Sequence, residues 1–119
     1  MPTPSASSPI EQLAIRQLAA YNTFDLDAFC ACYHPGVRMF DGEELELEGI
    51  ETFRARYADM FANGGFGGTV SRRLSVGQHC IDEEEWWRID PETGERQAGV
   101  ILVRYVERDG TIGLVQFLG

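Results

Sequence analysis

Apolar side chains recur at helical spacing in three segments of the first half of the chain. Ser8 is a typical helix cap, because a proline follows at the first helical position and an acid lies three residues later. A second helix is expected from Asp25 to Pro35, and a third between Gly49 and a glycine-rich loop at 63–68. The apolar faces of these segments consist of Ile10, Leu13, Ala14, Leu18 and Tyr21, then Leu26, Phe29, Cys30 and Tyr33, then Ile50, Phe53, Tyr57, Met60 and Phe61.

Alternation of apolar and polar residues marks most of the remaining chain as strands. The glycine and glutamine at 77–78 suit a two-residue hairpin turn between two of these strands. Such a turn places Arg73 opposite Asp82 and Ser71 opposite Glu84. The expected strands cover residues 37–41, 44–48, 70–76, 79–88, 97–107 and 111–118.

This order of elements predicts an α+β fold, in which three helices of the N-terminal half pack on one face of a strongly bent antiparallel sheet. The third helix is inserted between strands. Residues 9–119 are expected to form one domain, because a chain of 119 residues can bury a core. Residues 1–8, rich in Pro, Ser and Thr, are expected to be a disordered tail.

Composition and charge exclude several functional classes. The formal net charge of −9 argues against nucleic-acid binding, which needs a concentrated basic face. All ten basic residues are arginine, so no lysine can form a Schiff base. No apolar run approaches the roughly 18 residues of a membrane span, and the first residues lack the pattern of a signal peptide. We therefore expect a cytoplasmic protein that does not contact a membrane.

The cysteines are expected to be free, buried thiols, because their number is odd and no secretory signal precedes them. Cys30 and Cys32 lie two residues apart on an expected helix and so point to different faces. They therefore cannot bind one metal ion together with His34. No phosphate loop, serine-nucleophile elbow or metal-ligand spacing occurs in the sequence. Neither a metal nor another cofactor is expected.

An ordered set of features spans nearly the whole chain from Ile10 onward. It consists of the helix pair between Tyr21 and Tyr33, Asp41 at the end of the first strand, Glu48-Gly49 before the third helix, and the final turn between Tyr105 and Ile112. In this order the features resemble the nuclear transport factor 2-like superfamily, in particular its SnoaL-like and ketosteroid-isomerase-like bacterial members. The resemblance implies a cone-shaped fold, with a bent sheet wrapped around the helices and an apolar pocket at the open end. It also implies a small hydrophobic ligand, polyketide- or steroid-like, and a homodimer formed through the sheet.

By this resemblance, Asp41 matches the general base of the ketosteroid-isomerase branch. On an inward face beside Val37 and Met39, its carboxylate would be desolvated and its pKa raised toward neutrality. The alternative is that Asp41 only begins the turn with Gly42, where aspartate is common.

The same branch needs an oxyanion hole, whose two positions correspond by the resemblance to Gln17 and Leu102. Leucine cannot donate a hydrogen bond, which argues against steroid isomerisation. Tyr21, one helical turn beyond Gln17, is either a substitute donor or a core aromatic residue. His79 is a second acid/base candidate, because SnoaL-like cyclases pair an aspartate with a histidine, but its place beside a turn favours an exposed histidine.

Arg73, Asp82 and Glu84 form a polar cluster on the expected hairpin. Facing the cavity, an arginine between carboxylates can orient a polar substrate; facing outward, the same residues form a cross-strand ion pair. The run of acids at 82–85 favours the outward orientation. Arg104 shares a face with Leu102, and in the pocket it would need an acid partner such as Asp41.

These observations predict a domain that binds a small hydrophobic molecule, with cofactor-free acid/base turnover of the isomerase, cyclase or hydrolase type. The catalytic candidates are Asp41, His79 and Tyr21. The expected ligand-binding residues are Val37, Met39, Tyr33, Tyr57, Leu102, Arg104, Val115 and Phe117. A non-catalytic ligand-binding domain and a dimeric structural or regulatory domain are the alternatives.

Overall fold

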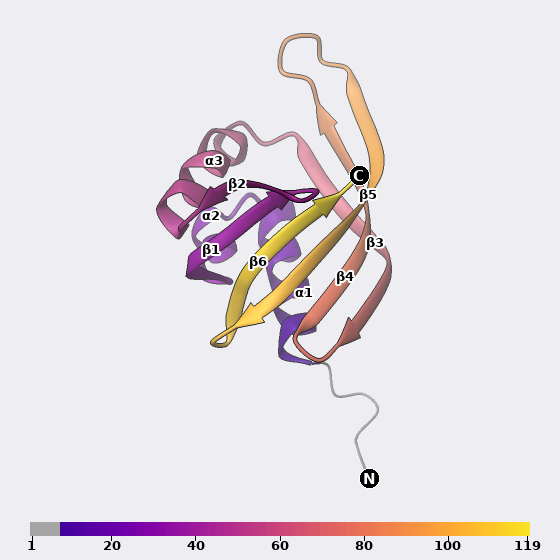
Figure 1. Ribbon diagram of the computed structural model, residues 1–119. Coiled ribbons are helices and arrows are strands. Elements are labelled where there is room, and N and C mark those ends of the chain that lie inside the picture. The colour runs from indigo at the N-terminus through magenta and orange to yellow at the C-terminus, as the bar shows by residue number, and fades with distance from the viewer. Residues whose placement is uncertain (1–7) are drawn as a thin grey trace.

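The computed structural model describes residues 8–119, in which three helices lie on one side of a six-stranded sheet (Figure 1). The expected tail at 1–8 lies outside the described residues except for Ser8, whose hydroxyl accepts a hydrogen bond from the Glu11 amide and caps the first helix. The helices are α1 (Pro9–Asn22), α2 (Leu26–Ala31) and α3 (Ile50–Asn63). The strands are β1 (Tyr33–Asp41), β2 (Glu44–Glu48), β3 (Phe66–Val76), β4 (His79–Ile89), β5 (Arg96–Arg108) and β6 (Thr111–Leu118).

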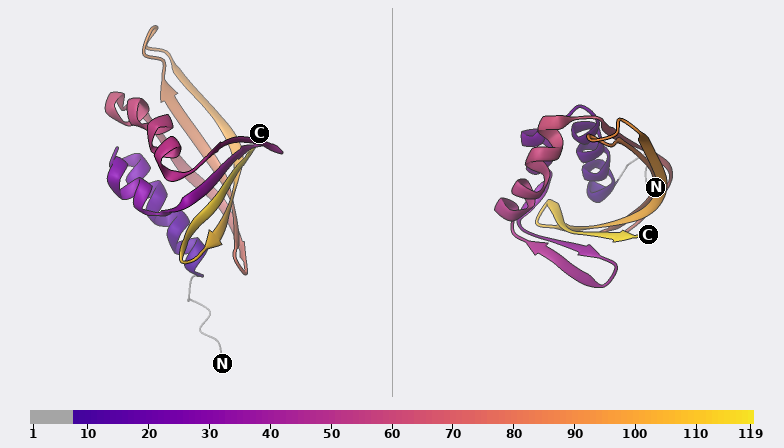
Figure 2. Two further views of the ribbon diagram at one scale, coloured as in Figure 1. Left: turned by 60° about the vertical axis from the view of Figure 1, so that its left-hand side comes forward. Right: turned by 90° about the horizontal axis from the view of Figure 1, so that it is seen from above.

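The sheet has the strand order β2-β1-β6-β5-β4-β3. Its pairings are antiparallel, as expected, except that β1 and β6 run parallel. After β2 the chain crosses through α3 to the far edge of the sheet, and three successive hairpins return it to the side of β1. Figure 2 shows the sheet curving around the helices, so that its concave face carries the core. The expected α+β architecture with a bent sheet is therefore confirmed.

The second helix is shorter than expected. It ends at Ala31, and the segment from Tyr33 to Pro35 belongs to β1. The residue before a proline disfavours helical backbone, and Tyr33 instead pairs with Ile112 of β6. His34 therefore closes no helix.

The β3–β4 hairpin confirms the two-residue turn, because Val76 pairs with His79. Arg73 lies opposite Asp82, as expected. Ser71 does not lie opposite Glu84, because the register shifts between Val70 and Arg72 and Val70 takes that place. A bulge of this kind inserts one residue into one strand, which a sequence pattern does not reveal.

No helix within residues 8–119 is long and apolar enough to cross a lipid bilayer.

Candidate functional site

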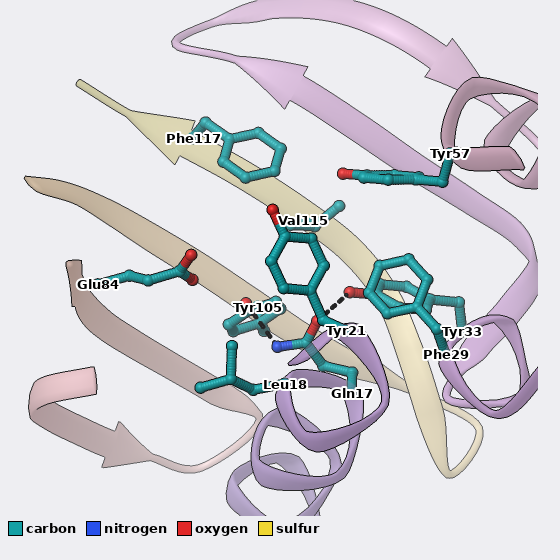
Figure 3. Close-up of a pocket in the computed structure, with 10 residues that line it drawn as sticks. All are labelled: Gln17, Leu18, Tyr21, Phe29, Tyr33, Tyr57, Glu84, Tyr105, Val115 and Phe117. Carbon is teal, nitrogen blue, oxygen red and sulfur yellow. Dashed lines mark hydrogen bonds between the residues drawn. The ribbon is translucent and has the colours of Figure 1, made fainter. Parts of the chain in front are cut away.

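A cavity of about 60 Å³ lies between α1 and the concave face of the sheet (Figure 3). Helix α1 contributes two neighbouring residues and a tyrosine one turn later, and the remaining wall comes from α2, α3 and four strands. The lining residues are Gln17, Leu18, Tyr21, Phe29, Tyr33, Tyr57, Glu84, Tyr105, Val115 and Phe117. Hydroxyl, amide and carboxyl groups thus face one small space with aromatic walls.

The amide of Gln17 organises one side of this cavity. Its Nε2 donates to the Tyr105 hydroxyl at 3.0 Å and to the Ala14 carbonyl at 3.1 Å, while the Tyr33 hydroxyl donates to its Oε1 at 2.9 Å. Gln17 is only 4% exposed, so these bonds satisfy an amide that would otherwise be costly to bury. The network fixes Tyr33 and Tyr105 in place around the pocket.

The four tyrosines of the wall remain neutral phenols. Burial is the main cause that raises the pKa of Tyr21, Tyr33, Tyr57 and Tyr105 above the usual value. Within residues 8–119 the Tyr21 hydroxyl makes no hydrogen bond, whereas the Tyr57 hydroxyl donates to the Met39 sulfur at 3.7 Å. The Tyr21 hydroxyl is therefore available to a ligand as a donor.

Glu84 is the ionisable group of the pocket. Burial, followed by the nearby charge of Asp82, raises the pKa of its carboxyl to about 7. Within the described chain this carboxyl makes no hydrogen bond, and Figure 3 shows it directed into the cavity. A Cβ on Gly68 would lie 2.8 Å from Glu84 Oε2, so the missing side chain at that position makes room for the carboxyl.

Arg73 and Asp82 form a separate, fully paired ion pair on the same hairpin. Arg73 Nε lies 2.6 Å from Asp82 Oδ1, and Nη2 lies 2.9 Å from Oδ2. Asp82 is 1% exposed and therefore faces inward, contrary to the outward orientation that the acid run favours. Glu84 shares this inner face two residues later, but its carboxyl does not pair with Arg73.

Asp41 lies outside the pocket, in an adjoining hollow of about 270 Å³ at the mouth of the cone. Asp41 is exposed and not enclosed, because β1 ends there and turns through Gly42, which agrees with the alternative that Asp41 begins this turn. The lining residues of this hollow are Met39, Asp41, Glu46, Arg56, Tyr57, Met60 and Phe117.

Leu102 and Arg104 lie on the convex face of the sheet. Successive residues of a strand point to opposite faces, and Val103 and Tyr105 occupy the inner one at 1% and 3% exposure. Leu102 is 41% exposed, and Arg104 donates to Gln116 at 3.0 Å on the neighbouring strand. The expectation that these two residues line the pocket is therefore wrong.

The other sequence candidates are distributed between wall, core and surface. Tyr21, Tyr33, Tyr57, Val115 and Phe117 lie in the wall of the cavity. Val37 is fully buried in the core, and Met39 lines the outer hollow. His79 is exposed beside the β3–β4 turn and lines neither space. No group of three or more His, Cys, Asp or Glu residues among 8–119 is arranged to hold a metal ion.

The family model of the SnoaL-like domain matches residues 14–113. The chain belongs to the SnoaL-like domain family. Comparison with curated protein sequences found no significant match.

Solved structures share the fold of this SnoaL-like domain at low sequence identity. An uncharacterised cystatin-fold protein from Novosphingobium aromaticivorans has a TM-score of 0.82 and 20% identity, over 96% of this chain and 100% of that chain. A protein from Jannaschia sp. CCS1, assigned as a SnoaL-like polyketide cyclase, has a TM-score of 0.78 and 14% identity, over 99% of this chain and 90% of that chain. TerC, co-crystallised with polyporic acid, has a TM-score of 0.80 and 14% identity, over 93% of this chain and 91% of that chain.

Sequence reasoning undervalued several residues of this SnoaL-like pocket. The sequence places Gln17 only at one of the two oxyanion-hole positions, and it places Glu84 in a polar cluster whose run of acids favours the outward orientation. A signal for Glu84 was present, because alternation from the small apolar Cys80 places residues 82 and 84 on the same inner face. The network around Gln17 joins residues up to 88 positions apart, and no local pattern predicts it.

Proposed function

We propose that this SnoaL-like domain binds a small hydrophobic molecule at the cavity of Figure 3 and exchanges a proton with it through Glu84. The observation that carries this proposal is a half-buried carboxyl that lines the cavity and makes no hydrogen bond within residues 8–119, in a wall that also presents the Tyr21 hydroxyl. A general acid or base works best with a pKa near the ambient pH, which Glu84 has. The fold relatives assigned as a polyketide cyclase or co-crystallised with polyporic acid support a small-molecule role.

The proposed turnover is cofactor-free and of the isomerase, cyclase or hydrolase type. Glu84 would take a proton from the bound molecule or give one to it, while a neutral tyrosine donates to the oxygen on which charge develops. Tyr21 is the candidate for that donor, since it lines the same cavity and its hydroxyl is uncommitted within residues 8–119. Asp41, proposed from the resemblance as the base, would act from the mouth of the cone rather than from the inner cavity.

Proton linkage on ligand binding tests this assignment. Isothermal titration calorimetry with para-phenylphenol near pH 7, in buffers of different ionisation enthalpy, should show protons taken up on binding, because a neutral ligand that displaces water from Glu84 raises the pKa of its carboxyl further. Glu84→Gln should abolish this exchange, and Glu85→Gln, on the exposed side of the same strand, should preserve it. Exchange that survives in Glu84→Gln but disappears in Asp41→Asn would transfer the role to Asp41.

A non-catalytic ligand-binding domain is the second candidate. It is favoured by the Gln17 network, in which the buried amide is already satisfied by protein groups. In that case para-phenylphenol binds without proton exchange in the wild-type chain.

We further propose that the domain forms a homodimer through the convex face of the sheet, as a structural or regulatory assembly would also require. Four apolar residues of this face are 41–67% exposed: Leu74 and Val76 on β3, and Val100 and Leu102 on β5, which is separated from β3 by β4. Exposed apolar residues gathered on one surface commonly mark an interaction site.

The three cysteines are free and buried, which is consistent with the cytoplasmic location that we propose.

A further inference from the structure

Two hollows of this molecule share a common wall. The inner cavity, with Glu84, and the outer hollow, with Asp41, are both lined by Tyr57 and Phe117. These two rings therefore stand between the half-buried carboxyl of Glu84 and the mouth of the cone.

The inner cavity is too small to hold a ring. Its volume of about 60 Å³ is less than half of the roughly 150 Å³ of a cavity that holds benzene. The outer hollow, at about 270 Å³, is large enough. A molecule that reaches Glu84 must therefore place a narrow polar group in the inner cavity and its rings outside.

The two rings that separate the hollows, Tyr57 and Phe117, differ in how firmly they are held. We call this pair of rings the partition. Tyr57 packs against the rings of Phe29 and Phe53, with centroids 5.0 Å away in both cases. Phe117 makes no ring–ring contact within residues 8–119 and lies one residue before the end of β6. Phe117 is therefore the side of the partition that can move.

The charges near the two hollows disfavour an anion. Asp41 and Glu46 outnumber Arg56 at the mouth, and none of the three is paired in an ion pair within the described chain. At the inner end, the charge of Asp82 already opposes a second negative charge on Glu84. A neutral ligand avoids repulsion at both ends.

We propose that the two hollows form one ligand site, with Phe117 as the gate that determines which molecules enter. The occupant is a neutral molecule with one or two rings and a narrow hydroxyl or carbonyl head that reaches Glu84. This inference rests on the proposed function, because it assumes that the ligand engages Glu84.

A size series at Phe117 tests the gate. Calorimetric titration with para-phenylphenol should give a dissociation constant about tenfold higher in Phe117→Trp than in the wild type, because the larger ring closes the passage. Phe117→Ala and the milder Phe117→Leu should bind as tightly as the wild type or more tightly. Leu118→Ala is the matched control, since this neighbour is exposed, and its affinity should not change. The anionic para-phenylbenzoate should bind at least about tenfold more weakly than para-phenylphenol to the wild type.

The ¹³C carboxyl resonance of Glu84, followed during the same titrations, separates the gate from the proposed function. We expect it to move with ligand in the wild type and to move less in Phe117→Trp. Equal affinities in all Phe117 variants, with the Glu84 resonance moving in each, would overturn the gate and leave the proposed function standing. Affinities that respond to Phe117 while the Glu84 resonance stays fixed would confine the ligand to the outer hollow and overturn both. Failure of the wild type and Phe117→Ala to bind either probe would overturn the joined site.

Discussion

Glu84 illustrates how one side chain acquires chemistry from its surroundings. Its carboxyl is ordinary in composition, but the aromatic wall removes it from water and Asp82 adds a negative charge nearby. Both effects disfavour the ionised form, and no hydrogen bond within residues 8–119 compensates them. Ionisation of Glu84 therefore costs more free energy in the folded protein than in the unfolded chain.

The cost of ionising Glu84 in the folded state predicts how the free energy of unfolding depends on pH. The folded pKa of about 7 exceeds the usual 4.5, so the folded state binds more protons than the unfolded state between these values. Stability should therefore fall as pH rises from about 5 to 7, by at most about 3 kcal/mol. In Glu84→Gln this part of the slope should vanish, so that the variant is more stable than the wild type at pH 8. Urea denaturation at pH 5 and pH 8 measures the difference.

The exposed neighbour supplies the control for this prediction. Glu85→Gln should keep the wild-type slope, because residue 85 faces solvent. A Glu84→Gln variant with an unchanged slope would show that another group causes the pH dependence.

At this scale the sequence predicts types of residue better than their partners. Helical spacing identifies Tyr21 and Tyr57 as inward-facing, and the structure places both in the wall of the cavity. Leu102 is expected in the pocket only from the resemblance, and Arg104 only because it shares a face with Leu102, whereas the inner face of β5 carries Val103 and Tyr105. The pKa of Glu84 depends on residues of distant segments, so it emerges only from the folded chain.

At the scale of elements, the C-terminal end of α1 is held against the sheet by the side chain of Asn22. Asn22, the last residue of α1, donates from Nδ2 to the Gly68 carbonyl and accepts at Oδ1 from the Gly68 amide, both at 2.9 Å. This pair of bonds imitates the pairing of another strand along the start of β3. It holds the end of α1, which carries Tyr21, against the strand beside Glu84.

Loss of the two hydrogen bonds between Asn22 and Gly68 should lower the free energy of unfolding without changing the fold. Asn22→Ala loses two hydrogen bonds to one backbone position, and we expect the free energy of unfolding to fall by about 1–2 kcal/mol. Hydrogen exchange at the Gly68 amide should accelerate at the same time. Chemical denaturation and exchange followed by NMR measure the two effects.

Asn63→Ala is the matched control, because Asn63 also ends a helix but its side chain makes no hydrogen bond within residues 8–119. Its stability should change little. Equal losses in the two variants would indicate an effect of the helix ends in general and not of the link to Gly68.

Elements with strong local signals were predicted well, and those decided by tertiary pairing were not. The cap at Ser8 and the turn at 77–78 are local, and the structure contains both. The early end of α2 follows from the pairing of Tyr33 with Ile112, far along the chain. The shift between Val70 and Arg72 likewise reflects the curvature of the sheet rather than a turn residue.

At the scale of the whole molecule, the sheet has two unlike faces. The concave face holds the core and the pocket, whereas the convex face leaves large apolar residues in contact with solvent. The order of elements predicted this architecture, because helices followed by curved strands leave few ways to cover the apolar faces. The volume of the cavity could not be predicted, since the positions of a few aromatic rings determine it.

The convex face gives a direct test of assembly. Leu102→Glu introduces a charge beside Glu83, its register partner on β4, and should convert the proposed dimer to a monomer. Sedimentation equilibrium measures the change in mass. Leu45→Glu is the control, because Leu45 is equally exposed, at 42%, but lies on β2 at the opposite edge of the sheet from β3. A monomeric wild type at high concentration would contradict the proposed dimer.

The space left by the missing side chain of Gly68 has a consequence for protein engineering. Any other residue there brings a carbon to within 2.8 Å of the Glu84 carboxyl and must displace it. The acid strength of the pocket can therefore be tuned from a position that carries no functional group of its own. In a mutational library, substitutions at 68 should shift the pKa of Glu84 while every side chain of the pocket stays the same.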